Sequence, residues 1–182
     1  MNWIWHIRPV VLSLFVAVAC VAPESPKGVI AVELTSLAGV WFDIVHLPHP
    51  LLENCSNSRS LYRNPQHGQM DFIFECQQPD SLWYSVSGSF HRHAENNDLL
   101  VFDFDSVQIE VLFELSYWIL AADFSEGWMA VGHPDEDWFW LLSRSPTMES
   151  SLRLKILAEI DARGLYGYPS LAQEVELTHH DQ

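Results

Sequence analysis

The residues best suited to chemistry in this 182-residue chain are its histidines and cysteines. Three pairs of histidines lie close in the sequence, as a metal or haem site would need: His46 and His49, His91 and His93, and His179 and His180. Residues i and i+2 of a strand share a face, but two ligands without a third are weak support for a metal site. A haem or metal binder stays open as an alternative function, while no metal ligand set and no cofactor are predicted.

Catalytic motifs give no further candidates. The sequence contains no G-x-S-x-G, no H-E-x-x-H and no cysteine in the context of an activated thiol. We therefore predict no catalytic residue and expect a protein that is not an enzyme.

The first of the three cysteines, Cys20, follows a short apolar run. That run, 10–19, is too short to span a bilayer comfortably as a helix and is typical of a signal peptide. Ala17 and Ala19 are small at the positions that a signal peptidase reads, which predicts a signal peptide over 1–19 and cleavage just before Cys20.

A cysteine at the new amino terminus resembles the bacterial lipobox, in which the thiol is lipidated before cleavage. Several acyl chains on Cys20 would anchor the protein stably, and residues 20–31 would form the lipidated terminus and a tether. Val21 follows the cysteine, and the absence of Asp there resembles proteins that are sent to the outer membrane. The alternative is an ordinary secretory cleavage that exposes a cysteine.

A row of large side chains near the end of the chain needs a strand to position it. In DEDWFWLLSRSPT, Trp138, Trp140, Leu142 and Arg144 occupy alternate positions, and a strand would turn all four toward one face. That face is aromatic and apolar at one end and cationic at the other.

The chain after the tether reads as short strands separated by turns. Eight runs alternate in hydrophobicity or are rich in β-formers, namely 39–47, 57–63, 70–76, 82–91, 98–105, 117–124, 128–133 and 137–143. Such a meander can close on itself and remove its exposed edges, so we expect an all-β, eight-stranded, antiparallel up-and-down barrel.

One helix is predicted outside the barrel. Leu152, Ile156 and Ile160 lie on one stripe, Gly164 can end the helix, and Thr147 or Ser150 can cap its start. Residues 173–177 could return as a ninth strand.

The two remaining cysteines lie at neighbouring strands, Cys55 just before the strand 57–63 and Cys76 at the end of the strand 70–76. Folding these strands about the NPQHGQ turn pairs Tyr62 near Met70, which brings Cys55 within about one residue of Cys76. In an oxidising periplasm this register predicts a disulfide.

Charge narrows the range of partners. The formal net charge is -15, from 9 Lys and Arg against 24 Asp and Glu, and such a surface repels phosphate backbones. Nucleic acid is therefore not an expected partner, and the oligomeric state stays open, a dimer included.

Three stretches together resemble the lipocalin family, in its bacterial outer-membrane lipoprotein form, which is similar to apolipoprotein D. VELTSLAGVWFDI carries the G-x-W arrangement at Gly39 and Trp41, AADF at 121–124 resembles the second signature, and GHPDEDWFWLLSRSPT resembles the third. The similarity covers about 32–177. The departures are His133 before Pro134, the altered second signature, and the long apolar segment SVQIEVLFELS at 106–116.

The resemblance implies a role for each residue of the row. The family's barrel closes at one end by stacking its G-x-W tryptophan on an arginine, so Trp41 and Arg144 are expected to form a structural pair. The alternation then turns a set of apolar and aromatic side chains toward a ligand cavity: Tyr62, Phe72, Phe74, Tyr117, Ile119, Trp138, Trp140 and Leu142. The alternative is that these side chains simply fill the interior.

The implied function is lipid binding. We expect a lipocalin domain over 32–178 that is anchored in the outer membrane, faces the periplasm, and carries or stores a fatty acid or lysophospholipid. The ligand's anionic group would stay near solvent, where His46, His49 and Arg59 are the nearest candidates to meet it. The alternatives are a binder of haem, metal or another small hydrophobic ligand, and an envelope interaction module that binds no ligand and docks through 106–116.

Overall fold

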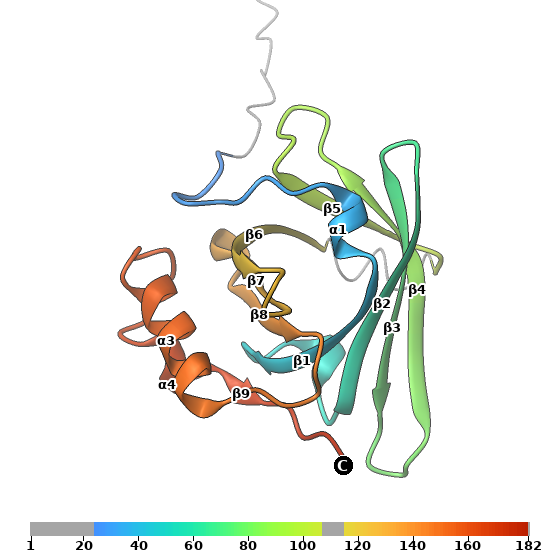
Figure 1. Ribbon diagram of the computed structural model, residues 1–182. Coiled ribbons are helices and arrows are strands. Elements are labelled where there is room, and N and C mark those ends of the chain that lie inside the picture. The colour runs from blue at the N-terminus through green and yellow to red at the C-terminus, as the bar shows by residue number, and fades with distance from the viewer. Residues whose placement is uncertain (1–23, 107–114, 182) are drawn as a thin grey trace, which may run out of the picture.

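The computed structural model describes residues 24–106 and 115–181 and contains a closed antiparallel barrel (Figure 1). Its strands follow one another around the sheet in chain order, and β1 pairs with both β8 and β2, which closes the barrel. The strands are β1 Gly39–His46, β2 Ser56–Gln66, β3 Gln69–Gln77, β4 Trp83–Arg92, β5 Leu99–Phe104, β6 Ser116–Asp123, β7 Trp128–His133 and β8 Trp138–Ser143. The expected all-β, eight-stranded barrel is confirmed, and closure leaves few strand edges exposed.

The hairpin between β2 and β3 is longer than the sequence suggested. Both strands extend to a tight turn in which His67 and Gly68 have φ values of 51° and 81°, a backbone conformation that suits glycine. The observed register pairs Tyr62 with Phe72, so the expected pairing near Met70 is wrong by two residues. The ladder shifts between Ser56 and Arg59, and this shift still brings Cys55 and Cys76 together.

The expected disulfide is present. The sulfur atoms of Cys55 and Cys76 are 2.05 Å apart and their Cα atoms 5.4 Å apart. The bond joins the loop before β2 to the end of β3.

Two hydrophobic clusters separate the interior of the barrel from its outside. The inner cluster contains Trp41, Tyr62, Phe72, Phe90, Phe102, Tyr117 and Leu142, among others. The outer cluster contains Trp118, Leu120, Phe139 and Leu141, packed against helical side chains. Alternation along each strand assigns successive residues to the two clusters.

The alternation changes on β6. A bulge between Ile119 and Ala121 adds one residue to β6 relative to β7. Ala121, which strict alternation would turn inward, therefore belongs to the outer cluster, and Ala122 packs against the inner one.

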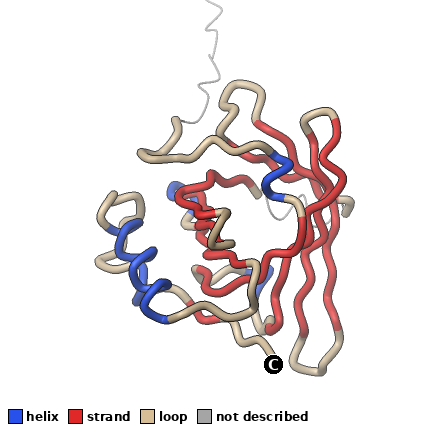
Figure 2. The backbone as a smooth tube through the Cα atoms, viewed as in Figure 1, coloured by secondary structure: helices blue, strands red, loops and turns tan. Residues whose placement is uncertain are grey.

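A helix covers one side of the barrel, as expected. Helix α3, Ser150–Asp161, buries Ile156, Leu157 and Ile160 against the outer cluster, and a second short helix, α4, spans Leu171–Glu174 (Figures 1 and 2). Gly164 follows α3 with a φ of 63°, as predicted for its end. The expected cap is wrong, because Glu149 occupies the N-cap position without a side-chain bond, and Thr147 contacts Ser145 instead.

Three short elements lie at the ends of the barrel. Helix α1, Leu34–Leu37, precedes β1, and the 3-10 helices η1, Pro50–Leu52, and η2, Pro134–Glu136, lie in the β1–β2 and β7–β8 connections. Loops at the η1 and η2 end form the mouth of the barrel.

The end of the chain completes the barrel wall. Strand β9, Glu176–Leu177, is shorter than the expected 173–177 and pairs with Val45 and His46 of β1. The residues after it contact β2, since the Asn57 amide donates to the His179 carbonyl at 2.8 Å and the Asp181 amide donates to Asn57 Oδ1 at 2.7 Å. We call residues 176–181 the seam segment, because it bridges β1 and β2 near the mouth.

Some expectations concern residues that the structure does not describe. Cys20 and the signal peptide 1–19 lie outside the described residues, as does most of the apolar segment 106–116. In the part of the chain that is described, no helix is long and apolar enough to cross a membrane.

Candidate ligand-binding cavity

A stacked cation closes one end of the barrel. The Arg144 guanidinium carbon lies 3.7 Å from the centroid of the Trp41 ring, and Trp41 Nε1 donates to the Leu37 carbonyl at 2.7 Å. Gly39 allows this approach, because it has a φ of 108° and a Cβ there would lie 2.8 Å from Arg144 Nη1. The G-x-W spacing therefore has a direct physical reason in this chain.

Arg144 also holds the chain that crosses the closed end. Its Nη1 donates to the Val40 carbonyl at 2.9 Å, and its Nη2 donates to the carbonyls of Ala38 at 2.7 Å and Ser36 at 3.3 Å. The fork of donors thereby joins the end of β8 to α1 and the start of β1.

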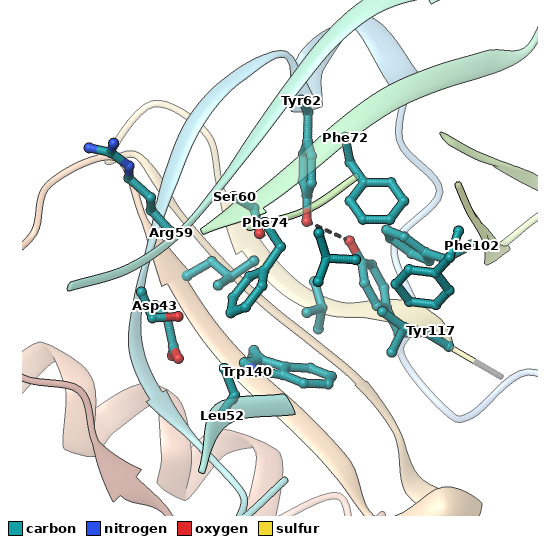
Figure 3. A pocket seen from close by; sticks show the side chains of 16 residues that line it. Asp43, Leu52, Arg59, Ser60, Tyr62, Phe72, Phe74, Phe102, Tyr117 and Trp140 are labelled. Carbon is teal, nitrogen blue, oxygen red and sulfur yellow. Dashed lines mark hydrogen bonds between the residues drawn. The ribbon is translucent and has the colours of Figure 1, made fainter. Parts of the chain in front are cut away.

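An apolar cavity lies inside the barrel, toward the mouth (Figure 3). Its volume is about 60 Å³, well below the ~300–1,000 Å³ of pockets that hold drug-sized ligands. An elongated ligand can therefore enter only if lining side chains move. The lining residues are Asp43, Leu52, Ser58, Arg59, Ser60, Tyr62, Phe72, Phe74, Val86, Phe102, Phe104, Leu115, Tyr117, Val131, Trp140 and Leu142.

Six of the eight side chains expected to contact ligand line this cavity: Tyr62, Phe72, Phe74, Tyr117, Trp140 and Leu142. Ile119 is buried in the inner cluster, two residues deeper along β6 than Tyr117. Trp138 begins β8 at the mouth, where its ring lies 4.9 Å from that of His49.

Aromatic contacts hold the wall together. Phe102 stacks on Phe90 with ring centroids 4.8 Å apart, and Phe72 meets Phe102 edge to face at 5.2 Å. The hydroxyls of Tyr62 and Tyr117 lie 3.0 Å apart and are hydrogen bonded (Figure 3). Burial raises the pKa of both tyrosines, so both hydroxyls stay protonated and satisfy each other inside the cavity.

The cavity has one polar side that the sequence reasoning did not include. Asp43 and Ser58 both line the cavity and are 2% and 0% exposed. Alternation could have found Asp43, because it follows the inward-facing Trp41 by two residues in VWFDI. Val86 and Val131 were also missed, and Leu52 comes from η1 in a loop that alternation does not describe.

The cations expected to meet an anionic ligand group are already engaged. His46 Nδ1 lies 2.8 Å from Asp43 Oδ2, and the Arg59 guanidinium pairs with Glu75 at 2.9 Å and points away from the cavity (Figure 3). Burial and the nearby charge of His46 lower the pKa of His49 to about 4, so this ring is neutral at pH 7. The arrangement leaves a ligand's anionic group best placed in solvent beyond the mouth.

The other histidine pairs do not form a metal site in the described part of the chain. His91 Nδ1 lies 3.1 Å from Asp103, and His180 Nε2 lies 2.7 Å from the Asp43 carbonyl oxygen. Within 24–106 and 115–181, no three His, Cys, Asp or Glu side chains gather in a way that could hold a metal ion.

A closed antiparallel barrel with a plugged end, an external helix and an apolar interior cavity defines a small-ligand-binding calyx. Residues 32–173 match the lipocalin-like domain family, and the chain belongs to that family.

Two bacterial relatives resemble the chain in sequence, and a solved structure resembles it in fold. The chain is 26% identical over 160 residues to the outer membrane lipoprotein Blc of Citrobacter freundii, covering 84% of this chain and 88% of the relative. It is 27% identical over 150 residues to the Vibrio cholerae protein of the same name, covering 78% and 82%. Insecticyanin from the tobacco hornworm Manduca sexta matches with a TM-score of 0.65 and 15% identity over 87% of this chain and 86% of that one.

Proposed function

We propose that this protein binds an elongated apolar lipid, a fatty acid or a lysophospholipid, and carries or stores it in the bacterial envelope. The observation that carries the proposal is the apolar cavity, which opens toward the mouth of a barrel whose other end Arg144 and Trp41 plug. Its wall of aromatic and aliphatic side chains suits an acyl chain, and its position leaves a charged headgroup in solvent. The function is binding and involves no catalysis.

The relatives support an envelope location. They are named outer membrane lipoproteins, and Cys20 stands where a lipobox cysteine would be lipidated. We propose that a lipidated Cys20 holds the barrel at the outer membrane on its periplasmic side, with residues 20–31 as the tether. A carrier in this position lies beside its source of lipid.

Trp140 provides the test of the cavity. Trp140→Ala removes an indole from the ligand site and should weaken dodecanoate or lysophospholipid binding about tenfold. This factor corresponds to the loss of roughly 60 Å² of apolar contact with the ligand. Its stability loss should stay below the ~3–5 kcal/mol of packed cores, because a cavity already adjoins the ring. Titrations by calorimetry and thermal melts measure the two effects.

Trp83→Ala is the matched control. Trp83 is half exposed on β4 and lies under Arg59, 4.9 Å from its guanidinium carbon, so its removal should leave lipid binding unchanged. Equal affinities of wild type and Trp140→Ala would contradict the proposed cavity. Mass spectrometry of native protein extracted from its source should find a co-purifying acyl lipid.

A further inference from the structure

Asp43 places a carboxylate inside an otherwise apolar cavity. It is paired with Leu142 of β8, follows Trp41 on the inward face of β1, and is 2% exposed. Its Oδ2 lies 2.8 Å from His46 Nδ1, while Oδ1 has no hydrogen-bond partner among the described residues. A buried acceptor of this kind costs stability unless something donates to it.

Ser58 supplies a second polar group on the neighbouring strand. The last β1–β2 pair joins Phe42 to Arg59, and Asp43 and Ser58 are the next residues beyond that pair on the two strands. Ser58 is fully buried and lines the same cavity, and its Oγ also has no partner within the described part of the chain. Two unsatisfied polar groups therefore line the same cavity, each next to the last pair between β1 and β2.

The chemistry of the two groups selects a ligand. A carboxylate only accepts hydrogen bonds, whereas a serine hydroxyl can donate one. A ligand hydroxyl can donate to Asp43 Oδ1 and accept from Ser58 Oγ, so it satisfies both. A ligand carboxylate could accept from Ser58, but it would be repelled by Asp43.

The charges around Asp43 do not change this selection. His46 compensates Asp43 from the Oδ2 side, where it also lies 3.7 Å from Glu176 and 3.2 Å from Thr178 Oγ1. The Arg59 guanidinium is held outside by Glu75. Neither cation is therefore placed to receive a ligand carboxylate inside the cavity.

We propose that Asp43 and Ser58 form a polar subsite that recognises a hydroxyl on an otherwise apolar acyl or alkyl ligand, in preference to a fatty-acid carboxylate. The inference rests on the proposed function, since it requires that the cavity binds lipids at all. It deepens that function by naming the polar group that the cavity accepts.

The test compares three probes of one chain length in the purified full chain at pH 7.5. Dodecan-1-ol donates and accepts, methyl dodecanoate only accepts, and dodecanoate is anionic. Calorimetric titration should show dodecan-1-ol binding about tenfold more tightly than dodecanoate and several-fold more tightly than the ester. Differences of this size are expected when a buried polar group is left without a hydrogen-bond partner.

Two variants test whether the preference for dodecan-1-ol comes from Asp43 and Ser58. Asp43→Asn removes the charge at nearly constant shape and should reduce the tenfold preference to about threefold or less. Ser58→Ala should weaken dodecan-1-ol binding about fivefold, and it keeps the test decisive if Asp43→Asn fails to fold. Asp103→Asn and Ser89→Ala make the same chemical changes on the outside of the barrel and should leave all three affinities unchanged.

The outcomes separate the subsite from the proposed function. If all three probes bind equally, or if both cavity variants keep the wild-type preference, the subsite is wrong while lipid binding stands. If no probe binds to folded wild-type protein, lipid binding and the subsite both fail. A preference that only the cavity variants abolish supports the subsite.

Discussion

Arg144 makes its hydrogen bonds and its ring contact at the closed end of the barrel. It stacks on Trp41 and donates to three backbone carbonyls, those of Ser36, Ala38 and Val40. Arg144, the last residue of the row that begins at Trp138, therefore stabilises the closed end of the barrel. Its planar fork of donors explains why this position needs arginine rather than another cation.

Arg144→Ala should lower the free energy of unfolding by roughly 2 kcal/mol, because it leaves carbonyls without donors and uncovers the Trp41 ring. Arg144→Lys should recover only part of this loss, since an ammonium cannot reach three carbonyls in one plane. Urea unfolding of the three proteins measures the effect, with lipid affinity as the second readout. An unchanged stability with lost affinity would assign Arg144 to the ligand site instead.

Single residues of the site were predictable where strict alternation holds. Trp140 and Leu142 follow from the row that ends at Arg144, and both line the cavity. The same rule applied to Trp41 leads to Asp43, which the expectation of an apolar wall left out. The hydrogen bonds of a buried carboxylate depend on partners from other strands. The pattern of a single strand does not show those partners.

At the scale of elements, the sequence predicted the strands better than their registers. The eight runs correspond to the eight strands of the barrel, because each alternates and ends in turn residues. The bulge at Ile119 and Ala121 and the shift between Ser56 and Arg59 were not visible. Such irregularities depend on how neighbouring strands fit together, and local preference does not encode that fit.

The disulfide should stabilise the mouth of the barrel. Cys55 and Cys76 are separated by 21 residues, and a bridge across such a loop contributes about 3 kcal/mol in the chain-entropy model. The Cys55→Ser, Cys76→Ser double variant should unfold at correspondingly lower urea concentration than the oxidised wild type. Reduced wild type is the control and should match the variant. Equal stability of oxidised and reduced wild type would show that the bond contributes nothing.

The stability that His46 contributes at the seam segment should depend on pH. Burial opposes protonation of His46, but the hydrogen bond and charge of Asp43 and the charge of Glu176 outweigh it and raise the pKa of His46. Because the pKa of His46 is higher in the folded than in the unfolded protein, protonation of His46 stabilises the fold. This contribution is complete below the unfolded pKa of about 6.5 and is lost as pH rises through the folded pKa.

His46→Gln should therefore cost more stability at pH 6 than at pH 9. The expected difference is about 1.5 kcal/mol, the scale of a hydrogen bond that involves a charged group. Urea unfolding of wild type and variant at both pH values measures it. His179→Gln is the control, since His179 is exposed in the same segment and should show no such difference. A cost at pH 9 equal to that at pH 6 would contradict the assignment.

At the scale of the whole molecule, the anchor and the barrel should be separable. Cys20→Ser should move the protein from the membrane fraction to the soluble periplasmic fraction, because a serine carries no thioether-linked acyl chains. Lipid binding by the barrel should persist, since the cavity is built from residues 43–142. Fractionation with immunodetection, followed by titration of the soluble form, checks both parts. Retention of the serine variant in the membrane would exclude lipidation of Cys20 as the anchor.

The seam segment also sets the order in which this molecule can be completed. Residues 176–181 pair with the mouth end of β1 and contact the start of β2, so they complete the wall between these two strands. Hairpins between neighbouring strands can form early, whereas the contact between His46 and Thr178 joins residues 132 apart in the sequence and should form late. The barrel closes where β1 pairs with β2 and β8, so the mouth end of β1 should be the last part of the wall to form.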